Sequence, residues 1–175
     1  MRTHIRRPTS DSQTRFDARD YRRALGQYPT GVTVITTRGP DGRRIGITAN
    51  SFTSVSLAPP LVCWSPSKKA SHFSELENAA SFAVNVLAAG QHHLSRQFAT
   101  SGQDKFEGVG VTEGIGGLPL IEGAVAHFQC CTVLRVDAGD HLILLGEVVR
   151  YDADGGEPLV YHSGRYLTVG QHADV

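Results

Sequence analysis

A β-hairpin in the first third of the chain is the feature that most limits what the chain can fold into. Residues 31–37 are dense in β-branched side chains, which favour a strand. Turn-forming residues follow from Gly39 to Gly42, and Ile45, Ile47 and Ala49 then alternate with small or polar residues. Two strands joined by so short a turn lie antiparallel. The chain is therefore expected to build its sheet from hairpins.

The other secondary-structure signals fit the same plan. Helices are expected at residues 17–28, between an Asp17 cap and Pro29, at 67–76 with Ser67 as the cap, and at 91–98. Strands are expected at residues 61–64, 81–87, 124–136, 142–149, 159–161 and 165–169. No strand–helix–strand rhythm and no fixed repeat is present. The predicted fold is mainly β, an antiparallel β-barrel with peripheral helices, in preference to a doubly wound α/β sheet.

The 175 residues fit one compact domain, which we expect over residues 16–175. A flexible, basic N-terminal arm is expected over residues 1–15, because this stretch has no apolar periodicity. Seven arginines face three aspartates in the first 23 residues, so the arm could touch a polyanion. The whole chain balances 17 basic with 17 acidic side chains, however, and we expect no nucleic acid or membrane partner.

Hydropathy and cysteine usage indicate a cytoplasmic protein. No apolar run approaches the roughly 20 residues that span a bilayer, and the polar start lacks the apolar core of a signal peptide. The three cysteines cannot form a disulfide framework, because their number is odd and Cys130 adjoins Cys131. No metal site is expected, since adjacent strand residues point to opposite faces and His92 and His93 add no common zinc spacing.

Residues 48–56, Thr-Ala-Asn-Ser-Phe-Thr-Ser-Val-Ser, form an unusually polar stretch between two expected strands. Six of these nine residues carry a hydroxyl or an amide. One explanation is an edge strand whose hydroxyls face water. The other is a ligand with many hydrogen-bonding atoms, such as a phosphorylated heteroaromatic ring. Asn50 offers donors and an acceptor to ring amides, and Ser51 and Ser54 are small enough for close backbone approach.

Two further clusters carry polar chemistry. Residues 65–71 lie where the second helix is expected to begin, and helix N-termini favour phosphate, with Lys68 adding a charge and Ser71 a hydroxyl. An ordinary capped surface helix is the alternative. Gly139-Asp140-His141 forms a turn before an apolar strand, although a lone histidine more often ends partly buried with backbone partners.

These features occur together in a known family. The segments that carry the likeness are Pro29–Val32, Thr48–Ser56, Pro59–Val62, Phe82–Leu87, Asp104–Phe106, Gly139–His141 and Gly146–Val148. In this order they resemble the flavin reductase family of the FMN-binding split barrel, over residues 16–169. Members of that family are the small partners of two-component flavin-dependent monooxygenases. The resemblance implies a six-stranded, Greek-key-like antiparallel split barrel that forms a homodimer, with flavin near the subunit interface.

The resemblance also implies the site residues. Thr48 to Ser51 would run beside the isoalloxazine ring, residues 65–71 would hold the ribityl phosphate, and His141 would position the nicotinamide. Phe98 and Lys105-Phe106 would close over the flavin. The full set expected to bind cofactor is Thr30, Gly31, Thr48, Ala49, Asn50, Ser51, Ser54, Ser65, Ser67, Lys68, Ser71, Phe98, Lys105, Phe106, His141 and Tyr166.

The expected activity is that of an NAD(P)H:flavin oxidoreductase, which passes a hydride to FAD or FMN and releases the reduced flavin to a partner monooxygenase. The cofactors carry that chemistry themselves, which suits a chain without an evident acid–base pair. NADH is favoured over NADPH, because no arginine pair marks a 2′-phosphate site, while FAD and FMN stay equally open. The alternatives are a flavin-retaining oxidase of the same fold and a non-catalytic flavin-binding module, which would not need His141 or Tyr166.

Overall fold

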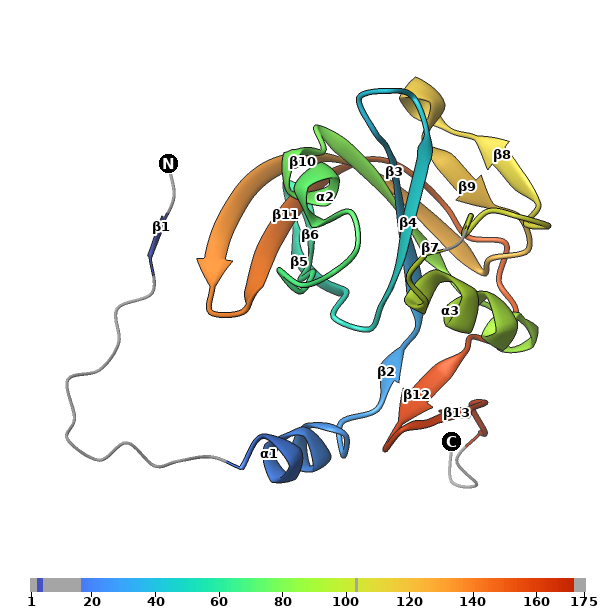
Figure 1. The fold of residues 1–175 in the computed structure, drawn as a ribbon. Coiled ribbons are helices and arrows are strands. Elements are labelled where there is room, and N and C mark those ends of the chain that lie inside the picture. The colour runs from blue at the N-terminus through green and yellow to red at the C-terminus, as the bar shows by residue number, and fades with distance from the viewer. Residues whose placement is uncertain (1–2, 5–16, 103, 172–175) are drawn as a thin grey trace.

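The structure is a computed structural model that describes residues 3–4, 17–102 and 104–171. Its main sheet contains β3 (Thr33–Arg38), β4 (Arg44–Ala49), β5 (Thr53–Leu57), β6 (Pro60–Trp64), β7 (Ser81–Val86), β10 (Ala126–Ala138) and β11 (His141–Asp152). In space the order is β4-β3-β7-β10-β11-β6-β5, and every neighbouring pair is antiparallel (Figure 1). This path has one strand more than the six that the resemblance implies. Because β4 ends the path, its outer edge has no strand partner there.

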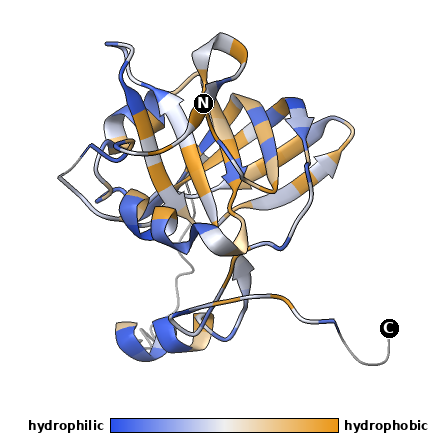
Figure 2. Cartoon of the chain, turned by 90° about the vertical axis from the view of Figure 1, so that its right-hand side faces the viewer, coloured by the Kyte–Doolittle hydropathy of each residue, from blue (hydrophilic) through white to orange (hydrophobic). Residues whose placement is uncertain are grey.

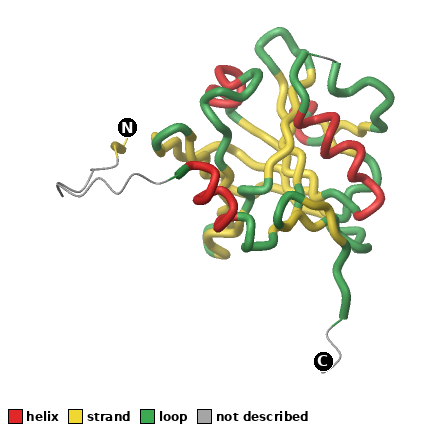
Figure 3. Tube along the Cα trace, turned by 60° about the horizontal axis from the view of Figure 1, so that its bottom comes forward, coloured by secondary structure: helices red, strands yellow, loops and turns green. Residues whose placement is uncertain are grey.

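Short elements surround the main sheet (Figure 3). A three-stranded sheet joins β2 (Thr30–Gly31), β12 (Val160–His162) and β13 (Arg165–Leu167), and β8 (Val111–Glu113) pairs with β9 (Pro119–Ile121). The helices are α1 (Ala18–Leu25), α2 (Phe73–Asn78) and α3 (His92–Ala99), with short 3₁₀ turns at Ala89–Gln91 and Ile115–Gly117. β1 (Thr3–His4) pairs in parallel with β10. The rest of the expected N-terminal arm lies outside the described residues.

Two apolar clusters lie on opposite faces of β3, because successive strand residues point to opposite sides. Ile35 joins Trp64, Phe82 and Leu144 in the larger cluster, and Val34 joins the cluster under α3. Figure 2 shows the apolar residues concentrated on the strands. The contact of α3 with β4 is close: a Cβ added at Gly46 would lie 2.5 Å from Cε1 of Phe98, so this contact requires glycine.

The fold class predicted from the sequence is confirmed, as are the hairpin of β3 and β4 and the Asp17 cap of α1. Two expected boundaries are wrong. The first helix ends at Leu25, before Pro29. The second helix begins at Phe73, because Ser67 instead forms a β-bridge with His141.

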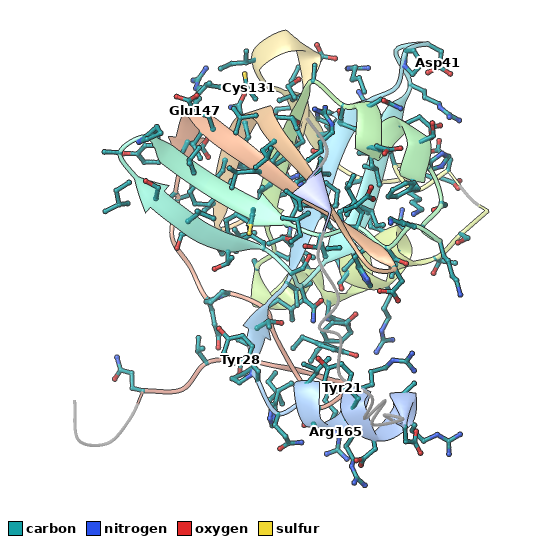
Figure 4. The ribbon with its side chains drawn as sticks, turned by 90° about the vertical axis from the view of Figure 1, so that its left-hand side faces the viewer. Tyr21, Tyr28, Asp41, Cys131, Glu147 and Arg165 are labelled. Atoms are coloured by element: carbon teal, nitrogen blue, oxygen red, sulfur yellow. The ribbon has the colours of Figure 1, made fainter. Side chains whose placement is uncertain are left out.

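The helix α1 stands away from the barrel and buries none of its residues. Figure 4 shows Tyr21 and Tyr28 below the barrel, where they are 53% and 77% exposed. Among the described residues, no helix combines the length and hydropathy needed to cross a membrane.

Candidate functional site

Three pockets meet at Asn50, the residue that follows β4. A ring pocket of about 250 Å³ lies between residues 47–51, residues 64–67 and His141. An α3 pocket of about 210 Å³ includes Ser95 and Tyr166, and an α1 groove of about 890 Å³ extends to the arginines of α1. The side chain of Asn50 has no hydrogen-bond partner among the residues that the structure describes, so its donors and acceptor are available to a ligand.

The walls of the ring pocket are tied together by Ser51. Its Oγ accepts a hydrogen bond from the backbone N–H of Ser65 at 2.9 Å, which joins the end of β4 to the segment after β6. Thr48 fixes the other side, since its Oγ1 donates to the carbonyl of Ser95 on α3 at 2.6 Å. These two hydroxyls are therefore used to shape the pocket, and the side chain of Asn50 and the backbone are among the groups left for a ligand.

The segment after β6 is held against the turn that precedes β11. Ser67 pairs with His141 across a β-bridge, and the N–H of Lys68 donates to the carbonyl of Asp140 at 2.9 Å. Lys68 Nζ lies 3.0 Å from Oδ1 of Asp137 and 2.9 Å from the carbonyl of Gly139. The charge of Lys68 thus already has a carboxylate partner, and its side chain secures the turn that carries His141.

His141 lines both the ring pocket and the α1 groove. Its Nδ1 lies 2.8 Å from Oδ1 of Asp140, and this hydrogen bond lowers the pKa of the Asp140 carboxyl from its usual value. An ionised carboxylate on Nδ1 orients the ring and leaves Nε2 for a ligand. On the opposite side, the hydroxyl of Tyr166 lies 2.9 Å from Oγ of Ser95, and the Tyr166 ring packs 5.6 Å from that of Tyr161.

Lys105 is a buried cation at the end of the site where phosphate is expected. It is 7% exposed, and its Nζ donates to Oγ of Ser71 at 3.2 Å and to the carbonyls of Gly46 and Phe98. Among the described residues it has no carboxylate partner, and burial lowers the pKa of its ammonium. A buried charge without an opposite charge is costly, so an anion beside Ser71 would be stabilising there.

Two buried polar atoms without partners show that the residues of the site fit a flavin. Trp64 lines the ring pocket, and its buried Nε1 has no hydrogen-bond partner within the described part of the chain. The same holds for the buried Oγ1 of Thr30, which lines the α1 groove. Most native buried polar groups are paired, so such atoms indicate a missing acceptor or donor. Together with the Lys105 ammonium they fit a ring with polar edges and a phosphate tail.

Nine of the sixteen expected site residues line these three pockets, whereas the other seven do not: Gly31, Ser54, Lys68, Ser71, Phe98, Lys105 and Phe106. Ser54 lies on the exposed edge strand β5, outside all of these pockets. Phe98 is fully buried against Phe106, with 5.0 Å between ring centroids, and lines none of them. The sequence did not predict four residues that also line pockets in this region: Arg43, Arg44, His72 and Tyr161. Of these four, only the adjacent pair Arg43-Arg44, just before Thr48, stands out in the sequence as a possible anion-binding signal.

Comparison with known proteins gives a consistent result. The family model described as "Flavin reductase like domain" matches residues 25–170. The chain is 43% identical over 150 residues to the FMN reductase (NADH) SmoA of Agrobacterium fabrum, covering 86% of this chain and 85% of that protein. It is equally identical, over 150 residues, to the reductase component of the flavin-dependent trigonelline monooxygenase of Acinetobacter baylyi, but spans only 48% of that relative.

A similar fold occurs in a solved structure, that of the NADH:FAD oxidoreductase SgcE6 of Streptomyces globisporus in complex with NAD and FAD fragments. The TM-score is 0.84 at 42% sequence identity, and the match covers 90% of this chain and 96% of that one.

Proposed function

This chain belongs to the flavin reductase like domain family, and we propose that it is an NAD(P)H:flavin oxidoreductase that favours NADH. It reduces FAD or FMN and releases the reduced flavin to a partner monooxygenase, in keeping with the names of its relatives. The nicotinamide supplies a hydride that the flavin accepts, so the chain itself has to bind the two rings, orient them and exclude water.

The observation that carries this proposal is the position of Asn50. A flavin reductase needs two ligands whose rings lie face to face at roughly 3–3.5 Å. Asn50 lies where the ring pocket opens into the α3 pocket and the α1 groove, and its amide has no other partner. The ring pocket then suits the isoalloxazine, and the space between His141 and Tyr166 suits the nicotinamide.

The expected site residues take the following roles in this proposal. Backbone groups of Thr48 to Ser51 hold the edge of the flavin ring, at the outer edge of β4, which is unpaired among the described strands. Ser67, Ser71 and Lys105 hold the phosphate end, and the hydrogen bond of Lys105 to Ser71 supports this. Six other members of the set support the site or its walls: Thr30, Gly31, Ser65, Lys68, Phe98 and Phe106. Ser54, on the exposed edge strand β5, takes no part in this arrangement.

The protein is proposed to act as a homodimer in the cytoplasm. Apolar side chains are exposed on the neighbouring strands β10 and β11, at Val133, Leu134, Val149 and Tyr151, and a second copy would cover them. Three free cysteines (Cys63, Cys130 and Cys131) support a reducing compartment.

Consumption of NADH in the presence of FMN or FAD, followed by absorbance, tests the activity. Turnover with either free flavin supports the reductase. A protein that binds flavin but never oxidises NADH would instead be a carrier. A flavin that stays bound through gel filtration and reacts with a small amine would indicate an oxidase of the same fold.

A further inference from the structure

One buried serine connects the two walls of the α3 pocket. Ser95 lies on α3, with β4 on one side and the hairpin of β12 and β13 on the other (Figure 1), and it is only 1% exposed. Its hydroxyl lies 2.9 Å from the hydroxyl of Tyr166, and its carbonyl accepts the hydrogen bond of Thr48 at 2.6 Å. Ser95 therefore joins the strand proposed to hold the flavin ring to the tyrosine proposed to face the nicotinamide.

The ring of Tyr166 has packing contacts of its own, but they leave its hydroxyl end to Ser95. The ring centroid of Tyr161 lies 5.6 Å away, with the two rings inclined by 58°, and Cζ of Arg96 lies 5.7 Å from the Tyr166 centroid. Aromatic and cation–π contacts allow a range of tilts and offsets. A hydrogen bond between two hydroxyls is directional, so the bond to Ser95 is what fixes the tilt of the Tyr166 ring.

The packing of α3 does not by itself explain a serine at this position. Serine forms helices less well than alanine, and burying a hydroxyl costs free energy unless the hydroxyl is hydrogen-bonded. A buried helix position therefore favours alanine. The side-chain partner of Ser95 is Tyr166, a half-buried residue that lines the α3 pocket. The hydroxyl of Ser95 thus serves the geometry of the pocket.

This geometry matters because hydride transfer depends steeply on how the two rings are placed. The rings have to lie roughly 3–3.5 Å apart, and a misplacement of about 1 Å can cost about a hundredfold in rate. Thr48 sets the position of β4 relative to α3, and Tyr166 is held to the same turn of that helix. The separation of the two walls therefore depends on a single residue of a helix.

Building on the proposed function, we propose that Ser95 is a positioning residue of the reductase. It acts through Tyr166, which it holds at the distance from β4 that lets the nicotinamide stack on the flavin ring. Loss of the Ser95 hydroxyl then impairs hydride transfer and leaves the binding of flavin almost unchanged.

The test compares Ser95→Ala, Tyr166→Phe and the double variant with the wild type. The rate of flavin reduction by NADH is measured without oxygen in single turnovers, and the flavin Kd is measured by fluorescence. Ser95→Ala should slow flavin reduction about threefold to tenfold, while the flavin Kd changes less than about twofold. The charge-transfer absorbance of the flavin–nicotinamide complex, which reports ring stacking, should decrease as well. In the Tyr166→Phe background, Ser95→Ala should slow reduction less than about twofold further, because the bond is already absent.

Ser74→Ala is the matched control, because it makes the same chemical change at an exposed serine of another helix, α2. It should leave the reduction rate, the flavin Kd and the charge-transfer absorbance unchanged. Thermal melts show whether each variant folds. Should Ser95→Ala not fold, Tyr166→Phe removes the same bond from its other end and should slow flavin reduction without weakening flavin binding.

Three outcomes would overturn the role of Ser95. They are an unchanged reduction rate in Ser95→Ala or in Tyr166→Phe, losses that multiply in the double variant, and equal losses of flavin affinity and reduction rate, which indicate a purely structural serine. Each can occur in a protein that still oxidises NADH with flavin. Failure of the proposed function is distinguishable, because it would show as flavin binding without turnover in the wild type.

Discussion

Replacing Lys105 and Lys68 one at a time tests which of these two lysines binds the flavin phosphate. Lys105 is buried without a carboxylate partner beside Ser71, whereas Lys68 is paired with Asp137 at 3.0 Å. The charge that a flavin phosphate meets should therefore come from Lys105. Lys105→Met keeps the length of the side chain and removes the charge.

The expected loss follows from the value of one charge-assisted hydrogen bond. Such a bond contributes about 1.5–3 kcal/mol, so the affinity for FMN should fall roughly tenfold to 150-fold in Lys105→Met. Riboflavin lacks the phosphate and should bind Lys105→Met nearly as well as the wild type. The decisive quantity is thus the ratio of the riboflavin Kd to the FMN Kd, which cancels any general damage to the ring pocket.

Fluorescence titration with both flavins gives this ratio for the wild type, Lys105→Met and Lys68→Ala. The ratio should collapse toward one in Lys105→Met and stay near the wild-type value in Lys68→Ala, where Asp137 already neutralises the lost charge. An unchanged ratio in Lys105→Met, or a collapse confined to Lys68→Ala, would refute the reasoning and return the phosphate to the segment after β6.

Three further outcomes are expected. Burial lowers the pKa of Lys105 below 10.5, and because only its charged form attracts phosphate, the preference for FMN over riboflavin should fade as the pH approaches 10.5; a flat ratio would contradict this. His141→Ala should raise the KM for NADH more than the Kd for FMN, and equal losses would point to a structural histidine. Gly46→Ala should cost about 1–3 kcal/mol of unfolding free energy, read as a lower Tm, because its Cβ meets the Phe98 ring; Gly90→Ala, with open space around it, is the control.

The fold was predictable because its main signals are local. The alternation in β3 and β4 and the turn between them lie within residues 33–49, and β10 and β11 with their turn lie within residues 126–152. The start of α2 was predicted wrongly for the opposite reason. Ser67 has the chemistry of a helix cap, but its backbone pairs with His141, a residue far along the chain that no local pattern connects to it.

The polar stretch over residues 48–56 shows why both explanations of it were reasonable. Its first half, through Ser51, lines the ring pocket, whereas Thr53 and Ser54 lie exposed on the edge strand β5. Composition alone cannot divide such a stretch, because the same residue types suit a ligand and water.

The charge pairing in the site could not be predicted from the sequence, because it depends on contacts between segments far apart in the chain. Lys68 has the charge that phosphate binding requires, and only the fold shows that Asp137 already holds it. A further pocket combines three segments, residues 43–46, His72 and residues 104–106, so the Arg43–Arg44 pair could be seen in the sequence but not placed beside Lys105.

The central claim is that the pockets meeting at Asn50 hold both ligands at once. The most direct measurement is a crystal structure of the protein soaked with FMN and NAD⁺. The account predicts the isoalloxazine in the ring pocket, its polar edge within hydrogen-bond distance of residues 48–51, and the nicotinamide stacked on it between His141 and Tyr166. Flavin density away from Asn50, or a nicotinamide out of contact with the flavin ring, would contradict it.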